Sequence, residues 1–133
     1  MRGLYQYVSN YYNSELLEFD YPKGDSSIGA ISGAQGSECG DALYGAAKRD
    51  FWVVASGADE VVEYALGGTG PIKTLSESAG EAASCAMDPS TGNLAVTILA
   101  TGDVVIFAGA SGTGATVADG LDSTYFDGYD NKG

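Results

Sequence analysis

The segment Asp88-Pro89-Ser90-Thr91-Gly92-Asn93-Leu94-Ala95-Val96-Thr97 decides the fold. Its first six residues are of the types that tight turns select, because proline fixes φ and both glycine and asparagine tolerate a positive φ. The residues from Leu94 to Ile98 are then apolar and of types that suit a pleated sheet. The segment therefore predicts the end of one strand, a turn and the start of the next strand.

Weaker copies of this pattern occur on both sides, so the chain reads as one unit written three times. Each copy has an apolar strand, a polar turn and a short strand that ends in an aromatic residue. The strand pairs are 7–10 with 16–19, 52–55 with 61–64, and 95–98 with 104–107. The closing aromatic residues, Phe19, Tyr64 and Phe107, are 45 and 43 residues apart. That period matches the ~40–45 residues of a four-stranded propeller blade.

Each repeat continues with a glycine-rich turn, a short third strand, a polar loop and a fourth strand. The third strands are predicted near 28–31, 72–75 and 115–118, and the fourth near 41–44, 84–88 and 124–127. Helical composition occurs at 42–49 and 76–86, but neither segment has a sustained apolar stripe of period 3.6. The chain is therefore predicted to be an all-β β-propeller half, with about twelve short antiparallel strands in three four-stranded sheets. The repeats span about residues 4–50, 51–93 and 94–133.

Strand alternation also predicts the core. The closing aromatic residues of the three repeats are expected to be buried between adjacent sheets. Most of the contacts between sheets are expected to come from Trp52, Val54, Val62, Leu94, Val96, Val105 and Phe107.

The repeat pattern resembles the NHL-like and related six-bladed β-propeller repeats. In those repeats a Gly-Asn-Leu-x-Val segment, here residues 92–96, precedes a turn and a Val-x-x-Phe/Tyr strand, here 104–107. The resemblance covers essentially the whole chain and implies three propeller blades. Many NHL repeats carry an arginine after the turn between these strands, whereas this chain has Glu15, Glu60 and Asp103. The basic surface with which some NHL domains hold RNA is therefore not implied.

Three blades cannot close a ring, because propellers close with about four to eight. The chain is thus either half of a six-bladed ring made by two copies or a fragment of something longer. The strand order favours the homodimer, because the chain opens on the second strand of a blade and ends on a first strand. Two copies would place Gly133 of one beside Leu4 of the other, twice, under a two-fold axis. The predicted assembly residues are Leu4, Tyr7, Val8, Tyr125, Phe126 and Tyr129.

Composition narrows the partners. The 133 residues are one domain's worth, 44% of them are apolar, and six basic against 18 acidic residues give a net charge of −12. Such a field repels phosphate, so nucleic acid and anionic membranes are not expected as partners. No apolar run approaches the ~20 residues that span a bilayer. The first residues also lack the apolar region of a signal peptide, so we expect a soluble chain.

The residues that carry chemistry are few. No histidine occurs, which excludes Ser-His-Asp and Cys-His catalysis and histidine-ligated metals. The glycine runs 67–70 and 109–114 do not continue to Gly-Lys-Ser/Thr, so they are interpreted as turns rather than phosphate loops. Asp127, Asp130 and Asn131 imitate part of a calcium loop without its spacing. No catalytic residue, cofactor or metal is therefore predicted.

Three interpretations of Cys39 and Cys85 stay open: small buried core residues, a disulfide across neighbouring blades, or a reactive thiol. Free cysteine usually packs like a small hydrophobic residue, so two reduced and inaccessible thiols are the preferred prediction.

The favoured function is a non-enzymatic propeller module that self-assembles into a ring and presents one face for binding. Tyr11, Tyr12 and Asn13 form the most ligand-like turn, because exposed aromatic side chains offer large contact area at little entropic cost. Asp59 in the matching turn completes the candidate set for a protein or small-molecule ligand. One alternative is a carboxylate- or metal-dependent hydrolase or lactonase, with Asp41 and Asp88 as a repeated pair. The other is a fragmentary or engineered self-assembling scaffold without a ligand.

Overall fold

Three antiparallel sheets make up the part of the chain that the structure, a computed structural model, describes: residues 4–32, 38–39, 50–118, 120–122, 124 and 128–129. The first sheet contains β1 (Leu4–Asn10), β2 (Glu15–Tyr21) and β3 (Ser27–Ser32). The second contains β4 (Glu38–Cys39), β5 (Asp50–Ala55), β6 (Glu60–Ala65) and β7 (Pro71–Ser76). The third contains β8 (Ala82–Met87), β9 (Leu94–Ile98), β10 (Val104–Phe107) and β11 (Ala115–Val117).

Short 3-10 turns are the helical elements of the described residues. They are η1 (Tyr11–Asn13), η3 (Ser56–Ala58) and η4 (Ala108–Ala110). The predicted all-β class is thus confirmed, and the described residues hold no helix that is long and apolar enough to cross a membrane.

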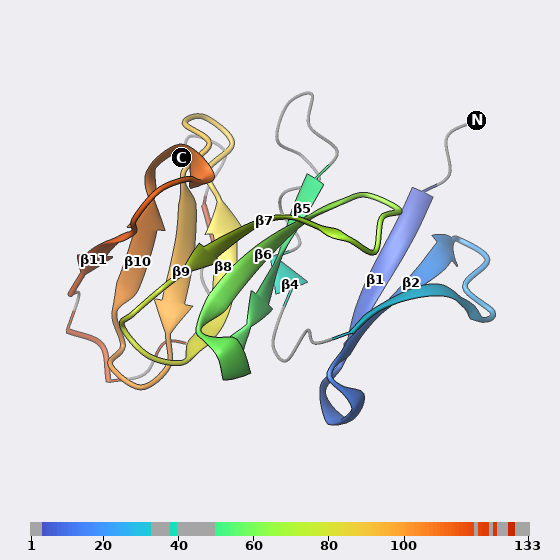
Figure 1. Ribbon diagram of the computed structural model, residues 1–133, viewed down its shortest axis with the longest axis horizontal. Helices are drawn as coiled ribbons and strands as arrows, with labels where there is room; N and C mark the ends of the chain where they lie inside the picture. Colours follow the sequence, from blue (N-terminus) through green and yellow to red (C-terminus); the bar gives the residue numbers. More distant parts are fainter. Residues whose placement is uncertain are drawn as a thin grey trace.

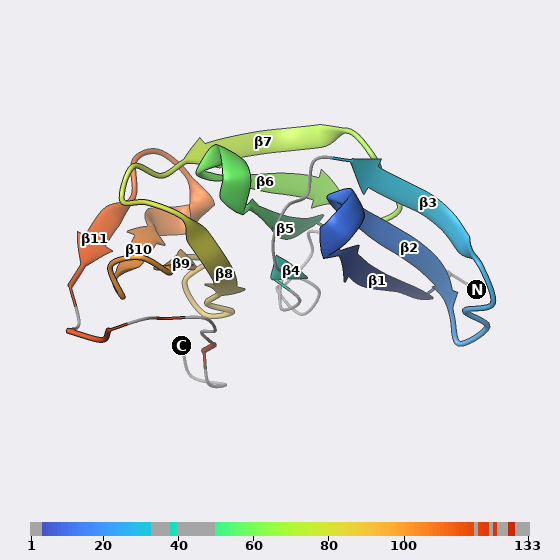
Figure 2. The same ribbon diagram turned by 90° about the horizontal axis from the view of Figure 1, so that it is seen from below.

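The sheets lie side by side in a curved row, with β3, β7 and β11 on its outer side and β4 and β8 on its inner side (Figure 2). Within each sheet, strands that follow one another in the chain pair as antiparallel neighbours. The first and second strands of the predicted repeats are confirmed as β1–β2, β5–β6 and β9–β10. The innermost described strand of the second sheet is Glu38–Cys39, and the strand predicted near 41–44 lies outside the described residues.

The predicted turn at Asp88 closes the hairpin between β8 and β9. The Asp88 N–H donates to the Asn93 carbonyl at 2.8 Å, and the Gly92 N–H donates to the Asp88 carbonyl at 2.9 Å. Gly92 has a φ of +73°, which glycine adopts without steric cost. The Asp88 carboxylate accepts hydrogen bonds from the Ser90 N–H and hydroxyl, both at 2.7 Å, and from the Thr91 hydroxyl. Hydrogen bonds of its own side chains therefore fix this turn, which explains why it could be predicted from the sequence.

These hydrogen bonds give the turn a pH dependence. The hydroxyls of Thr91 and Ser90 stabilise the carboxylate and lower the pKa of Asp88 from 3.8 to about 2. A lowered pKa stabilises the fold above the ordinary value, and this contribution is lost as pH falls through about 2. Asp88→Asn is therefore expected to lower the melting temperature at pH 7, and the difference from wild type should shrink between pH 4 and pH 2. Thermal unfolding across that range measures it, with the exposed Asp25→Asn as control, and a difference independent of pH would contradict the assignment.

Each sheet has two faces, because side chains alternate across a strand. We call the face toward the next sheet along the chain the forward face, and the opposite one the backward face. On the central strands, the forward-face positions are 16 and 18, 61 and 63, and 104 and 106. The backward-face positions are 17 and 19, 62 and 64, and 105 and 107.

Ring contacts define how the first and second sheets meet. Tyr7, on the forward face of the first sheet, has its ring centroid 4.4 Å from that of Phe51, on the backward face of the second sheet. Phe51 in turn stacks on Tyr64 at 5.9 Å. A forward face therefore packs against the backward face of the following sheet.

The core lies between the sheets, and the seven predicted core residues are all buried. Tyr64 and Phe107 are buried as predicted. The prediction for Phe19 is wrong, because this residue is only half-buried. Phe19 lies on the backward face of the first sheet, and no other described sheet covers that face (Figure 2).

The cysteine prediction is also wrong in its redox state. Cys85 is buried, as expected, but it is disulfide-bonded rather than reduced. The chain has one other cysteine, Cys39 in β4, and β4 lies against β8, which carries Cys85. The sequence spacing of the two cysteines does not show that β4 and β8 lie against each other, because that contact belongs to the packing of two sheets.

Candidate functional site

The clearest candidate site consists of two sheet faces that no other described sheet covers. One is the backward face of the first sheet, where the same repeat position can be compared in all three sheets. That position is held by Val8, Val53 and Val96, which pair with Leu17, Val62 and Val105. Val8 is 41% exposed, whereas Val53 and Val96 are 1% and 0% exposed. An apolar position that is sealed in two sheets is therefore open in the first.

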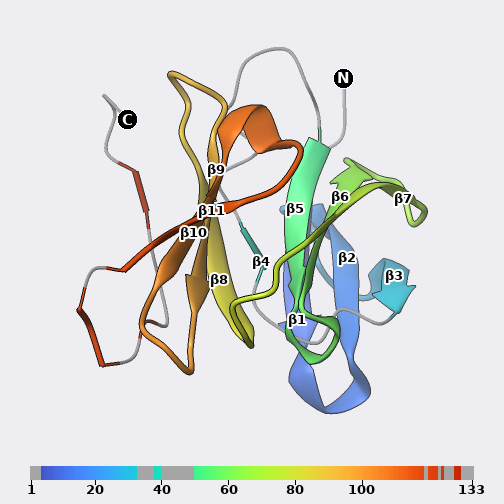
Figure 3. The same ribbon diagram turned by 60° about the vertical axis from the view of Figure 1, so that its left-hand side comes forward.

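The forward face of the third sheet shows the same contrast at the other end of the row. Ile31, Leu75 and Val117 occupy one repeat position, because each pairs with the first forward-face residue of its central strand. Ile31 and Leu75 are 4% and 5% exposed, but Val117 is 49% exposed. Val104 and Ile106 on the same face are half-buried, whereas Ala95 and Thr97 on β9 are buried, so this face is open along β10 and β11. The two open faces thus lie at opposite ends of the row (Figure 3).

Polar bonds cross the contact between the first and second sheets. Glu18 is buried on the forward face of the first sheet and accepts a hydrogen bond from the Tyr7 hydroxyl at 3.1 Å. The same hydroxyl accepts a hydrogen bond of 2.8 Å from the N–H of Gly67, in the turn after β6. A turn of the second sheet is thereby bonded to the face of the first.

The contact between the second and third sheets repeats this arrangement with other residues. Glu63 is buried at the position that corresponds to Glu18, and its carboxylate lies 3.8 Å from Lys73 Nζ. Lys73 Nζ also lies 5.8 Å from the centroid of the Trp52 ring and donates to the Ala110 carbonyl at 3.2 Å. Gly67 and Ala110 both come three residues after the closing aromatic of their repeat. At each internal contact, the residue three positions after the closing aromatic is therefore hydrogen-bonded to the forward face of the preceding sheet.

The open faces carry apolar residues at these two positions. Ile106 stands where the first two repeats have Glu18 and Glu63, and its strand neighbours across the sheet are Ala95 and Ala115. Pro22 stands three residues after Phe19, at the position of Gly67 and Ala110, and it has no N–H to donate. The open faces therefore differ chemically from the closed ones.

The inner edge of the first sheet is formed by β1 and differs from the inner edges of the other two sheets. β5 pairs with β4 and β9 pairs with β8, but β1 pairs with β2 alone among the described strands. An edge strand presents unpaired N–H and C=O groups that can template pairing with another chain. Among the described residues, the first sheet thus has no strand at the place that β4 and β8 hold in the other two sheets.

Residues near the carboxyl end run beside the turn between β9 and β10. Thr124 is buried and donates from its hydroxyl to the Ile98 carbonyl at 3.1 Å. The Leu121 carbonyl lies so close to Gly102 that a Cβ there would meet it at 1.8 Å. Figure 3 places this segment on the side of the third sheet that faces away from the second.

The predicted assembly residues are placed as follows. Val8 lies on the open backward face, whereas Tyr7 lies in the internal contact with Phe51. Leu4 pairs with Tyr21 through the backbone of β1 and β2. Tyr129 is half-buried, and Tyr125 and Phe126 lie outside the described residues. Sequence reasoning missed Ile106 and Val117, although the alternation within each repeat gives the face on which each lies.

The predicted ligand residues lie on equivalent turns of the first and second sheets. Tyr11, Tyr12 and Asn13 form η1, where Tyr12 is 96% exposed. Asp59 lies on the equivalent turn of the second sheet, after η3, with a positive φ of 52°. Of the aspartates weighed for carboxylate chemistry, Asp88 is held by its own turn and Asp41 lies outside the described residues.

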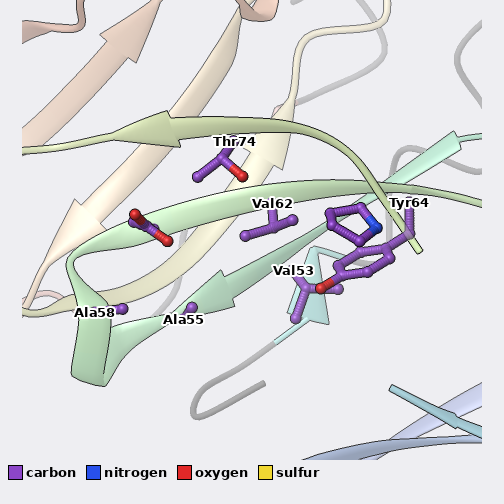
Figure 4. A pocket seen from close by; sticks show the side chains of 8 residues that line it. Val53, Ala55, Ala58, Val62, Tyr64 and Thr74 are labelled. Carbon is purple, nitrogen blue, oxygen red and sulfur yellow. The ribbon is translucent and has the colours of Figure 1, made fainter. Parts of the chain in front are cut away.

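A cavity of about 240 Å³ opens on the backward face of the second sheet (Figure 4). Its walls come from β5, β6, β7 and η3 and are mainly apolar. The lining residues are Val53, Ala55, Ala58, Glu60, Val62, Tyr64, Pro71 and Thr74. Burial raises the pKa of the Tyr64 hydroxyl. The groups of this lining that can transfer a proton are the Glu60 carboxylate and the Tyr64 hydroxyl.

Glu77 is a buried carboxyl group that sequence reasoning did not single out. It follows β7, its Oε2 accepts the Ala79 N–H at 2.9 Å, and its Oε1 is buried without a hydrogen-bond partner. Burial raises its pKa, and the nearby charge of Asp59 acts in the same direction. The described residues contain no group of three or more side chains suited to hold a metal ion.

No protein-family model and no curated protein matches this chain.

Proposed function

We propose that the protein is a non-enzymatic β-propeller module, and that two copies close one six-bladed ring. The observation that carries this proposal is that β1 has no inner neighbour among the described strands, whereas its counterparts β5 and β9 each pair with an inner strand. A second copy would supply the missing strand from its carboxyl-terminal segment, near residues 124–127. The same exchange at the other junction would leave no free edge.

The arrangement of the sheets supports this proposal. The row is curved, its inner strands are β4 and β8, and each internal contact joins a forward face to a backward face. A net charge of −12 and an exposed Tyr12 on η1 suit a ring that offers one face to a protein or small-molecule ligand.

The mass in solution tests the proposal. At micromolar concentration we expect twice the chain mass of 13.6 kDa, measured by light scattering or sedimentation equilibrium. Deleting residues 124–133 should abolish the dimer, because β1 of the partner loses its proposed inner strand. Deleting only 131–133 is the control and should leave the dimer intact. A folded wild-type monomer at this concentration would contradict the proposal, as would a dimer that tolerates the longer deletion.

A further inference from the structure

We infer that the two open faces dock on each other head to tail: the backward face of the first sheet of one copy packs on the forward face of the third sheet of a second copy. The inference rests on the proposed function in one respect, that the partner is another copy of this chain. It adds which surfaces meet, in which sense, and which residues decide the contact.

The first support is that the chain already makes this kind of contact twice. The forward face of the first sheet meets the backward face of the second through Tyr7 and Phe51. The forward face of the second sheet meets the third sheet through Lys73 and Ala110. No other described sheet covers the forward face of the third sheet or the backward face of the first. On the third sheet this leaves β10 and β11 open, because Ser84, Ala95 and Thr97 on β8 and β9 are already buried. These two are the faces that would form a contact of the same type.

The second support is the exposure of equivalent apolar residues. Val8 and Val117 are largely exposed, although the residues at their repeat positions in the other sheets are sealed. Leu17 and Phe19 on one face, and Val104 and Ile106 on the other, are half-buried. Burying apolar area stabilises a complex by roughly 25 cal/mol per Å², so binding of a partner to either face would be favourable.

The third support is the chemical match between the two faces. At both internal contacts the key forward-face position is a carboxylate, and the opposing turn is bonded to that face through Tyr7 or Lys73. At the open faces both positions hold other residues. The forward-face residue is Ile106 in place of a carboxylate, and the turn residue is Pro22, which has no N–H. An apolar residue therefore meets a turn that leaves no donor unsatisfied. A glutamate at position 106 would be buried without the partners that Glu18 and Glu63 have.

Head-to-tail docking also accounts for both faces with one partner. Two copies that joined through their backward faces alone would leave the forward faces and the β1 edges uncovered. A heterologous contact covers one face of each type, and two such contacts close a ring if the rotation is complete. If the rotation were incomplete, the same contact would grow filaments instead.

A complementation experiment tests the inference. Val8→Lys places a charge on the backward face, and Val117→Glu places one on the forward face. Both side chains are exposed in the single chain, so each variant is expected to fold, as circular dichroism and thermal unfolding would check. Each variant alone is expected to lose the dimer at micromolar concentration. An equimolar mixture should form a heterodimer, because one of its two junctions is unmodified and the other pairs lysine with glutamate.

Ile72→Lys is the matched control, because it adds the same charge at a 53% exposed apolar position of the second sheet. It should leave the dimer intact. A wild-type dimer that both face variants leave intact would overturn the assignment of Val8 and Val117 to the contact, and the deletion of residues 124–133 would then decide separately whether the ring fails as well. Loss of the dimer in Val8→Lys but not in Val117→Glu would overturn it in favour of a symmetric contact between backward faces. A monomeric wild type would instead remove the proposed function itself.

Discussion

Replacing Phe107 by alanine is expected to cost about 3–5 kcal/mol of the free energy of unfolding, the range for large-to-small changes of a buried phenylalanine. Phe107 has no exposed surface and lies on the backward face of the third sheet. A Cβ added at Gly114 would come within 3.0 Å of its ring, so the chain approaches the ring closely on that side. Such a tightly packed site cannot collapse around the missing ring, and urea denaturation at equilibrium would measure the loss.

Phe19→Ala is the matched control for this prediction. Phe19 ends the same strand of the first repeat but lies half-buried on an open face, so its truncation should cost clearly less in the single chain. Both variants should therefore be compared at concentrations low enough to keep the protein monomeric. Equal losses for the two variants would show that the backward face of the first sheet is covered after all.

The strands were readable from the sequence because their signals are local. The turn at Asp88 is held by hydrogen bonds within five residues, and the repeated closing aromatics fix the register of three hairpins. Residues such as Leu94 and Val96 alternate as a sheet requires, and both are buried. Local chemistry of this kind needs no knowledge of the remainder of the chain.

The burial of Phe19 could not be read in the same way. Its repeat position is buried in the second and third sheets, so the pattern alone predicts burial in the first. Whether a face is covered depends on which sheets lie beside it, and the first sheet lies at an end of the row. The exposure of Val117 could not be predicted for the same reason, because its counterparts Ile31 and Leu75 are buried in sheets that have a next sheet beside them.

The candidate site was predictable only in part. Strand order predicted the open edge at β1 and placed Val8 beside it. It did not distinguish Tyr7, one residue earlier, which lies on the opposite face in contact with Phe51. The substitution of Ile106 for the glutamates of the other repeats is visible in the sequence, but its meaning requires the bonds that Glu18 and Glu63 make.

The disulfide is the feature whose removal is expected to have the second large effect. Cys85 is bonded, and we expect its partner to be Cys39, the other cysteine of the sequence. Such a bond would join the innermost strands of the second and third sheets, which lie against each other. The chain-entropy model gives roughly 4 kcal/mol for a bond that closes the roughly 46 residues between these positions. The bond would thus stabilise the folded protein by lowering the conformational entropy of the unfolded chain.

Cys85→Ala is therefore expected to lower the free energy of unfolding by about 4 kcal/mol under oxidising conditions. Cys39→Ala should cost nearly the same, and the double variant little more than either, because each change removes the same bond. Wild type in excess reductant should approach the stability of the variants, whereas the variants themselves should not respond to reductant. Additive losses, or a Cys39→Ala variant as stable as wild type, would show that Cys85 pairs with another chain, and a non-reducing gel would then reveal a covalent dimer.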